Sequence, residues 1–284
     1  MIAVSVVIPA KNEAVSLGQI LPALWGVAGI SEVIVVDDGS GDGTGRVAAR
    51  HGAQVVTHQV SMGNGAAVKA GARRAREEFV LFMDGDGQHD PSDVTGLLQA
   101  LEQQNVDMVV GARGKSGQAS GARKLANGFY NRFASLISGQ KIADLTSGFR
   151  IVRKDLFLKY AYLLPNGFSY PTTITMAFLR GGYQVRFIPV DVRKRDGKSN
   201  IRPLRDGLRF LIIIFKVGTL YSPLKVFFPI AFVHFVLGVS RYVYTYVEMG
   251  TFTNMSALLF VTSVQIFLVG LVSEQITTLM YKDE

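Results

Sequence analysis

Short apolar runs alternate with helical patterns over the first 110 residues, and this alternation most constrains the fold. The runs are rich in Val and Ile and are bounded by Gly and polar residues, as expected of buried strands. The predicted strands cover residues 3–8, 33–36, 55–57, 79–83 and 107–111, with helices between most of them. Such alternation predicts an α/β fold with a mostly parallel, doubly wound sheet and helices on both faces.

Polar side chains stand where three of these strands end. Asn12-Glu13 follow the first strand, Asp37-Asp38 follow the second, and Asp84-Gly85-Asp86-Gly87-Gln88 follow the fourth. Ligands of such folds bind outside the carboxyl ends of the strands. We therefore expect these three tips to border one ligand site.

The third tip has the composition of a metal site. An extended backbone would point the side chains of Asp84, Asp86 and Gln88 to the same side, with glycines between them that let a phosphate approach. Oxygen ligands suit Mg2+ or Mn2+, which proteins usually hold with one or two carboxylates plus substrate phosphates. The alternative is an acidic turn that caps the helix after Pro91.

Charge is distributed unevenly along the chain. Residues 1–110 hold 13 acidic and 7 basic side chains, whereas residues 111–222 hold 20 basic and 5 acidic ones. An acidic part that could hold metal, followed by a basic part that could hold phosphates, indicates a polyanionic substrate between them. There is no cysteine, which excludes disulfides, cysteine metal sites and a thiol nucleophile. No nucleic-acid-binding motif occurs, so nucleic acid is not an expected partner.

The C-terminal part predicts a membrane attachment. Residues 224–247 and 255–281 are apolar, and each stretch exceeds the roughly 20 residues that a spanning helix needs. Before them, basic residues recur on one helix face, which predicts an amphipathic helix over 201–222 in the membrane interface. The loop 248–254 contains no Lys or Arg. The positive-inside rule then predicts a two-span cell-membrane protein with residues 1–222 in the cytoplasm.

Besides Lys225 and Arg241, whose long side chains can reach the membrane interface, the predicted spans contain His234, Gln265 and Glu274. Such residues in a membrane helix serve helix packing or a function. We expect them to join helices within the chain or a homo-oligomer, and the alternative is contact with a lipid substrate.

Six motifs in order carry a family resemblance. They are Val6-Val7-Ile8-Pro9-Ala10-Lys11-Asn12-Glu13, Val35-Val36-Asp37-Asp38-Gly39-Ser40, Gly63-Asn64-Gly65-Ala66-Ala67, Asp84-Gly85-Asp86-Gly87-Gln88-His89-Asp90-Pro91, Gly111-Ala112-Arg113 and Ser147-Gly148-Phe149-Arg150. Together they resemble family 2 glycosyltransferases of the GT-A fold, which is Rossmann-like. More narrowly, they resemble polyprenyl-phosphate sugar synthases such as dolichyl-phosphate mannose synthases and undecaprenyl-phosphate glycosyltransferases. The resemblance covers residues 3 to about 200, and the two-helix tail is similar to that of multi-pass members.

The resemblance implies roles for particular residues. The nucleotide pocket would be lined by Pro9, Lys11, Glu13, Val36, Asp38 and Gly85, with Asp38 on the base or ribose. The divalent metal and, through it, the donor diphosphate would be held by Asp84, Asp86 and Gln88. Donor or acceptor phosphates would contact Arg113, Arg123, Asn127, Ser147, Arg193 and Lys198.

Three departures from the family pattern leave the sugar and nucleotide unassigned. Lys11 stands where dolichyl-phosphate mannose synthases often carry an aromatic residue, and Asn127 replaces a serine. The GxSK loop appears as Gly197-Lys198-Ser199-Asn200, without its final lysine.

The chemistry of the acceptor can be argued from the residues alone. A hydroxyl acceptor needs a general base, whereas a phosphate monoester, with a second pKa near 6, is already a nucleophile at neutral pH. Between Ile151 and Val190 the only carboxylate is Asp155, and no QxxRW motif occurs. This favours a phosphate acceptor. Asp144 is the best candidate for a base, and its alternative role is a structural cap of the turn that follows it.

The sequence thus predicts metal-dependent transfer of one sugar from a GDP- or UDP-linked donor to a polyprenyl phosphate, dolichyl or undecaprenyl phosphate, at the cytoplasmic membrane face. One alternative is a membrane glycosyltransferase that acts on a lipid hydroxyl such as diacylglycerol. The other is a membrane protein that binds a nucleotide sugar without turnover.

Overall fold

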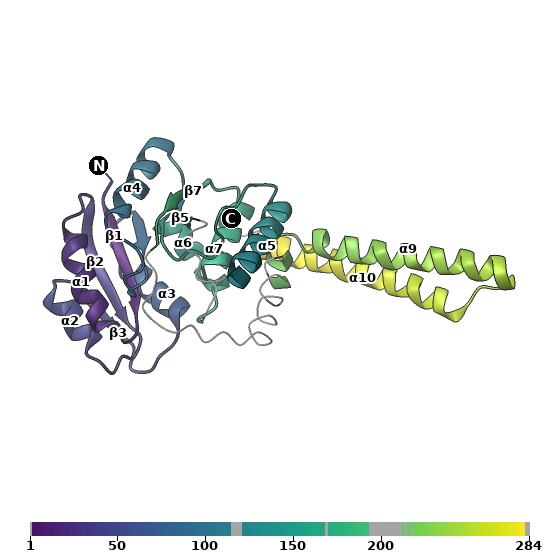
Figure 1. Cartoon of the computed structure of the whole chain (residues 1–284), viewed down its shortest axis with the longest axis horizontal. Helices are drawn as coiled ribbons and strands as arrows, with labels where there is room; N and C mark the ends of the chain where they lie inside the picture. The colour runs from purple at the N-terminus through teal and green to yellow at the C-terminus, as the bar shows by residue number, and fades with distance from the viewer. Residues whose placement is uncertain are drawn as a thin grey trace. The chain divides into compact units, whose positions relative to one another are not determined.

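The computed structural model describes residues 2–114, 121–167, 170–192, 212, 215–216 and 218–281, with the side chains of 121–127 left out. The chain separates into two compact units, Met1–Gly207 and Leu208–Glu284 (Figure 1). Each unit is described by itself.

The first unit is built on a seven-stranded sheet with the order β3-β2-β1-β4-β6-β5-β7. The strands are β1 (Val4–Ala10), β2 (Ile30–Asp37), β3 (Gln54–Thr57), β4 (Phe79–Phe82), β5 (Met108–Arg113), β6 (Arg150–Arg153) and β7 (Val185–Val190). All neighbours are parallel except β6, which runs antiparallel to both β4 and β5. The predicted α/β, mostly parallel sheet is therefore confirmed.

Helices cover both faces of this sheet. They are α1 (Ala14–Trp25), α2 (Thr44–Arg50), α3 (Asn64–Arg74), α4 (Asp93–Gln104), α5 (Gly121–Ser138), α6 (Lys154–Lys159), the 3-10 helix η1 (Ala161–Leu163) and α7 (Tyr170–Arg180). Alternate residues of β1 point to opposite sides: Val6 belongs to the core cluster shared with α1 and α4, whereas Val7 lies against Gly71 of α3. The sheet is therefore buried on both faces, which explains why its strands read as continuous apolar runs.

Helix α1 continues through Pro22. The helix runs on to Trp25, three residues beyond the proline. A proline inside a helix costs about 3 kcal/mol, but each fully buried Leu contributes roughly 1.5–3 kcal/mol. Leu21 and Leu24 are fully buried on either side of Pro22, so their packing outweighs that cost.

Two glycines let the start of α3 pack against the segment that follows η1. A Cβ atom at Gly65 would lie 1.9 Å from the carbonyl oxygen of Pro165. The backbones are joined there, because the Ala66 N–H donates to the Asn166 carbonyl at 2.9 Å. Lys69, one turn further along α3, donates to the side-chain oxygen of Asn166 at 2.7 Å. The glycines of the Gly63-Asn64-Gly65 motif are therefore explained by close backbone approach.

The second unit is a hairpin of two long helices, α9 (Pro223–Met249) and α10 (Asn254–Met280). Both are long and apolar enough to cross a membrane, and only 11% and 17% of their most apolar windows are buried. Exposure of so much apolar surface fits a lipid environment. The predicted spans thus match these helices to within two residues. The arginines of the predicted 201–222 helix lie outside the described residues.

Small residues line the seam of the hairpin. Buried positions recur every seven residues, at Ala231, Gly238 and Thr245 on α9 and at Ser256, Ser263, Gly270 and Thr277 on α10. The Ser263 hydroxyl donates to the Ala231 carbonyl at 2.8 Å across the seam. A seven-residue repeat of small side chains lets two helices approach closely over their whole length.

The three polar residues of the hairpin have different roles. Glu274 accepts a hydrogen bond from the backbone N–H of Leu224 at 3.1 Å and one from the Ser222 hydroxyl at 3.3 Å. It therefore joins the two helices by capping the start of α9, where a negative charge is favourable. His234 interacts with the Ile230 carbonyl of its own helix, and Gln265 is exposed on α10.

We predict that Gly65→Ala destabilises the first unit. The added methyl group would lie inside the van der Waals radius of a backbone oxygen, so the contact must open, at a cost of about 1–3 kcal/mol or more. Thermal unfolding of the full chain in detergent measures the change. Gly128→Ala on α5 is the control, since no atom lies within 4 Å of its added Cβ. Equal unfolding temperatures for the two variants would contradict the packing described.

Candidate active site

The loops after β1 and β2 are tied together at the carboxyl edge of the sheet. Asn12, which has a positive φ of 57°, links them with its backbone and side chain. Its backbone N–H donates to the Ser40 hydroxyl at 3.0 Å, and its side-chain oxygen accepts the Gly41 N–H at 2.9 Å. The first two polar tips are thus held in one place, as the strand order predicts.

Several residues expected to line the nucleotide pocket meet at this edge. Pro9 and Val36 are partners in the register of β1 and β2. Gly85 lies beside them, because a Cβ atom there would be 3.4 Å from the Pro9 carbonyl oxygen. Lys11 is exposed and Glu13 is half-buried next to the same loops.

Asp38, which we expect to contact the base or ribose, is bonded to groups of the chain itself. Its buried carboxylate is the centre of the loop 58–63. One oxygen lies 2.7 Å from His58 Nδ1 and accepts the Met62 N–H at 2.8 Å. The other accepts the Ser61 hydroxyl at 2.6 Å and the Gly63 N–H at 2.9 Å. A carboxylate has about four acceptor positions. Those of Asp38 are filled from within the chain, so a nucleotide contact would have to displace one of these groups.

The four interactions also set the charge of Asp38. Loss of hydration alone would raise its pKa, but the hydrogen bonds from Ser61, His58, Met62 and Gly63 outweigh it and hold the pKa well below its usual range. Asp38 is therefore an ionised anchor for the loop that leads into α3.

The acidic tip after β4 forms a turn and not the extended run that we expected. β4 ends at Phe82, residues 85–86 form a turn, and Gly87 has a φ of +75°. Asp86 accepts the backbone N–H of Gln88 at 3.2 Å, which fixes this turn. The side chains of Asp84 and Asp86 are thus neighbours because the backbone folds back, and not because of strand alternation.

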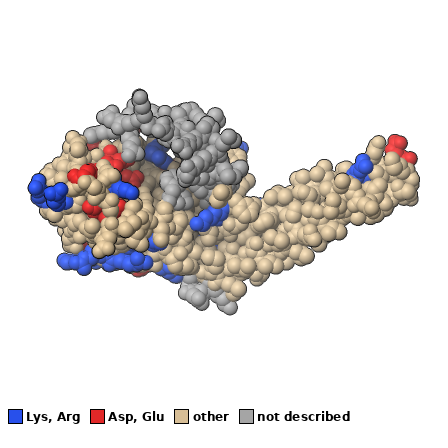
Figure 2. All heavy atoms as spheres, turned by 90° about the horizontal axis from the view of Figure 1, so that it is seen from below, with Lys and Arg blue, Asp and Glu red and all other residues tan. Residues whose placement is uncertain are grey.

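Asp84 is the electrostatic centre of the site. Loss of hydration, followed by the nearby charge of Asp86, raises its pKa to about 6, against opposing effects of Arg113, a hydrogen bond from Asn64, and Arg150. Backbone also comes close, since a Cβ atom at Gly148 would lie 2.9 Å from an Asp84 oxygen. Figure 2 shows acidic side chains gathered on one face of the first unit, with basic side chains around them.

Arg113 and Asp144 form the main ion pair beside the carboxylates. Arg113 donates from Nε at 2.7 Å and from Nη2 at 3.0 Å to the two oxygens of Asp144, and its backbone N–H also donates, at 3.2 Å. The same Nη2 contacts the Thr146 hydroxyl. Loss of hydration would raise the pKa of Asp144, but the bonds from Arg113 outweigh it and lower that pKa.

Arg150 is a fully buried cation beneath the turn 147–149. It donates to the backbone carbonyls of Ser147 and Pro171 and to the Thr175 hydroxyl. Burial lowers its pKa to about 10, so it stays charged at neutral pH. The Ser147 hydroxyl is also buried and has no hydrogen-bond partner within the described residues. Arg150 thus fixes the turn that carries Ser147.

His89 connects the acidic loop to the far side of the sheet. Its ring is buried and stacks on Phe149, with ring centroids 4.6 Å apart. The backbone of His89 forms an isolated antiparallel β-bridge with that of Val192, which follows β7. Burial lowers the pKa of His89 to about 4, so the ring is neutral at neutral pH.

Sequence reasoning did not assign roles to Asn64, His89 or Arg150, although all three lie in the motifs quoted above. Their positions beside Gly63, Gln88 and Phe149 in these motifs could have drawn attention to them. A motif alone does not show which residues contact one another. Among the predicted phosphate-binding residues, Arg193, Lys198 and the side chains of Arg123 and Asn127 lie outside the described residues.

Comparison with known proteins gives the family. The model for glycosyl transferase family 2 matches residues 5–161, which is more than half of the chain. The chain belongs to glycosyl transferase family 2. This glycosyltransferase also matches the GtrB C-terminal hairpin over residues 222–279, the region of α9 and α10. The predicted family resemblance is therefore confirmed.

The names of similar proteins indicate a subgroup within the family. Glycosyltransferase AglJ of Haloferax volcanii is 30% identical over 98% of this chain and 94% of its own length. The undecaprenyl-phosphate mannosyltransferase of Micrococcus luteus is 29% identical, over 69% of this chain and 86% of the relative. The polyprenol monophosphomannose synthase of Mycolicibacterium smegmatis is 28% identical, over 69% and 82%. This glycosyltransferase is therefore similar to polyprenyl-phosphate sugar synthases.

Solved structures confirm the GT-A type of fold. The glucosyl-3-phosphoglycerate synthase of Mycobacterium tuberculosis, in complex with Mn2+, UDP and phosphoglyceric acid, superposes with a TM-score of 0.60. It shares 22% sequence identity, over 76% of this chain and 77% of that chain. At this identity the likeness concerns the fold.

We predict that Asp38→Asn loosens the loop 58–63 and lowers stability. The side-chain NH2 group that Asn has in place of one oxygen would face partners that also donate. Each buried group left without a hydrogen bond costs about 1–3 kcal/mol. Because the pKa of Asp38 is lowered in the folded state, its contribution is present above the unfolded pKa of about 4 and is lost as pH falls below it.

Thermal unfolding of the full chain at pH 7 and near pH 3, about one unit below the unfolded pKa, tests this prediction. The difference between wild type and Asp38→Asn should be largest at pH 7 and should shrink in acid. Asp155→Asn, at a side chain that is 59% exposed, is the control. A difference that does not depend on pH would contradict the anchoring role of the charge.

Proposed function

We propose that this glycosyltransferase transfers one sugar from a nucleotide sugar to a polyprenyl phosphate, with a divalent metal at Asp84 and Asp86. The observation that carries the proposal is the pair of neighbouring carboxylates at the carboxyl edge of the sheet, next to the ion pair of the half-buried Arg113 with the buried Asp144. An acidic pair beside a fixed cation suits a substrate that brings both a diphosphate and a phosphate.

The residues present fit Mg2+ or Mn2+. Asp84 and Asp86 supply hard oxygen ligands. Loss of hydration and then the charge of Asp86 raise the pKa of Asp84, and a bound cation would stabilise both carboxylates in their ionised form. No group of three or more His, Asp or Glu side chains suited to a metal occurs in the described residues, which is consistent with a site completed by Gln88 and substrate phosphate. When bound, the metal would neutralise the leaving diphosphate as a Lewis acid. The Mn2+ and UDP in the Mycobacterium tuberculosis structure support this assignment.

The donor nucleotide would lie along the ends of β1 and β2. Pro9, Val36 and Gly85 would form its wall, with Lys11 and Glu13 at the rim, and either GDP or UDP would be accepted by this arrangement. Asp38 would act through the loop 58–63 that it anchors. The adjoining Asn64 would then hold Asp84 by the hydrogen bond between them.

A phosphate acceptor agrees with the state of Asp144. Its lowered pKa and its two bonds to Arg113 suit a residue that orients a cation, whereas a general base needs a pKa near the working pH. Arg113 and the buried Ser147 hydroxyl would bind the acceptor phosphate, together with Arg123, Asn127, Arg193 and Lys198. Because a phosphate monoester is already ionised, no base is required. The polyprenyl-phosphate relatives support this choice of acceptor.

The membrane orientation belongs to the same proposal. The loop 248–254 between α9 and α10 carries no Lys or Arg, so it would face away from the cytoplasm and the catalytic unit would face toward it. A polyprenyl phosphate in that leaflet would then share one compartment with soluble nucleotide sugars.

The direct test is a transfer assay with the full chain in vesicles that contain a short polyprenyl phosphate and Mg2+ or Mn2+. A panel of radiolabelled nucleotide sugars should give lipid-extractable label with at least one donor, and mild acid should release that label. Asp86→Asn should reduce the rate by about 10²–10³-fold, the size seen when a group that stabilises developing charge is removed. Asp155→Asn should leave it unchanged.

Two results would contradict the proposal. Absence of lipid-linked product with every donor would exclude this activity. Label that resists mild acid would instead identify a lipid hydroxyl as the acceptor.

A further inference from the structure

His89 carries a buried polar atom whose hydrogen bond is missing. The residue lies in the loop between the acidic turn and α4, and only 6% of its surface is exposed. Its Nδ1 atom is buried and has no hydrogen-bond partner among the residues that the structure describes. Such an atom is unfavourable in a folded protein, so an imidazole at this position needs an explanation beyond packing.

Stacking does not explain the nitrogen. The His89 ring lies nearly parallel to that of Phe149, with an angle of 19° between the two rings. Phe149 is itself closely packed, because a Cβ atom at Gly111 of β5 would lie 2.7 Å from its Cδ1 atom. The Gly111 N–H also donates to the Phe149 carbonyl at 2.9 Å. A phenylalanine at position 89 could form the same stack without leaving a buried nitrogen unpaired.

The unpaired nitrogen belongs to the part of the site where opposite charges meet. The charges of Asp86, Arg113 and Asp144 all act on this ring. A second buried polar atom without a partner in the described structure is the Ser147 hydroxyl, in the same turn as the stacked Phe149. Two unfilled hydrogen-bonding positions in one region of the site indicate a polar ligand there.

We propose that His89 is a phosphate-binding residue, whose Nδ1 donates a hydrogen bond to a phosphate oxygen of the bound substrate. A hydrogen bond to an ionised acceptor is stronger than one between two neutral groups. Both phosphate-bearing substrates of the proposed reaction would come to this place, the donor diphosphate at the carboxylates and the acceptor phosphate at Arg113. This role rests on the proposed function, to which it adds a binding residue.

The ring can present Nδ1 to a ligand and keep its stack. A half-turn about the Cβ–Cγ bond leaves the ring in the same plane and moves Nδ1 to the opposite edge. A neutral imidazole can carry its single N–H proton on Nδ1. Binding would therefore require a local rotation of one side chain.

Two substitutions separate the nitrogen from the stack. His89→Phe keeps an aromatic ring beside Phe149 and removes the nitrogen, whereas His89→Asn removes the ring and keeps an amide nitrogen near the position of Nδ1. We expect His89→Phe to weaken phosphate binding roughly tenfold to hundredfold, which corresponds to the loss of one hydrogen bond to a charged group. His89→Asn should bind more tightly than His89→Phe, although it should unfold at a lower temperature.

Isothermal titration calorimetry of the full chain in detergent, with Mn2+ present, measures the binding of UDP, GDP and farnesyl phosphate. Weaker binding of a nucleoside diphosphate by His89→Phe would identify the donor diphosphate as the ligand. Weaker binding of farnesyl phosphate would identify the acceptor phosphate. His51→Phe is the matched control and should bind as wild type does, since His51 lies between α2 and the start of β3, away from the carboxyl edge of the sheet.

A purely structural role of the ring would reverse the order of the two variants. His89→Phe would then bind every probe as tightly as wild type does, while His89→Asn would bind more weakly. That result would overturn the role of His89 and leave the proposed transfer reaction intact. A wild-type chain that binds none of the three probes would contradict both.

Discussion

The site depends on two carboxylates that the fold holds next to each other against their mutual repulsion. Asp84 loses hydration and feels the charge of Asp86, so its pKa rises to about 6. Such an arrangement is unfavourable in isolation and is kept only because the surroundings fix it. Here the surroundings are a turn closed by Asp86 itself, a hydrogen bond from Asn64 and the bare backbone of Gly148. This geometry is the basis of the proposed cation site.

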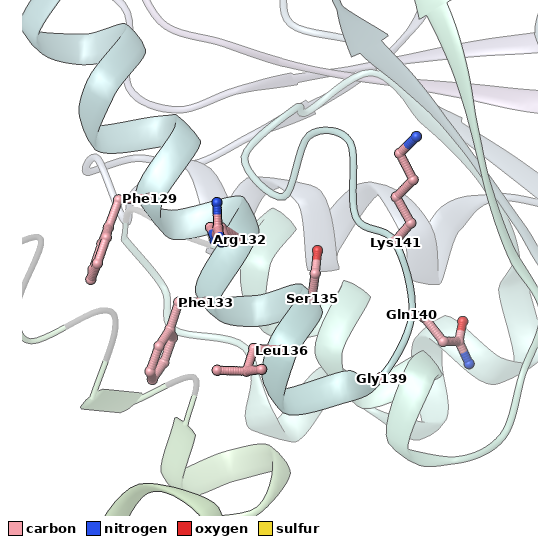
Figure 3. A pocket seen from close by; sticks show the side chains of 8 residues that line it. All are labelled: Phe129, Arg132, Phe133, Ser135, Leu136, Gly139, Gln140 and Lys141. Atoms are coloured by element: carbon pink, nitrogen blue, oxygen red, sulfur yellow. The ribbon is translucent and has the colours of Figure 1, made fainter.

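Positively charged side chains lie at three places around this acidic centre and do not neutralise it. Arg150 is fully buried and bonded to backbone carbonyls, so it fixes the turn 147–149. Arg113 is held by Asp144, so its guanidinium has a set orientation. Arg132 on α5 and Lys141, which follows the helix, are exposed (Figure 3), and Asn131 joins α5 to the residues around Asp144. Such an arrangement of charges would favour the approach of a polyanionic substrate to the carboxylates.

The sequence predicted the sheet well because its signals are local. Short β-branched apolar runs such as Val33–Val36 favour a buried strand. The bounds of both long apolar helices were predicted to within two residues. It did not identify partners that lie far apart in the chain. The bonds of Asp38 to the loop 58–63, twenty or more positions away, were not predicted. Glu274 joins the two helices, as expected, but its partner at the start of α9, fifty positions earlier, was not predicted. The turn at Gly85-Asp86 was read as extended, since glycines fit both conformations. Helix α1 runs past Pro22 to Trp25, because the packing of Leu21 and Leu24 outweighs local propensity.

The central claim is that Asp84 and Asp86 form a divalent-metal site that a nucleoside diphosphate completes. The most direct measurement is the electron paramagnetic resonance of free Mn2+, titrated with the full chain in detergent with and without UDP or GDP. The account predicts that the chain alone binds Mn2+ weakly and that one of the diphosphates tightens binding by about tenfold or more, because its oxygens add to two carboxylates. Asp86→Asn should abolish this gain. Equal Mn2+ binding by wild type and Asp86→Asn in the presence of both diphosphates would contradict it.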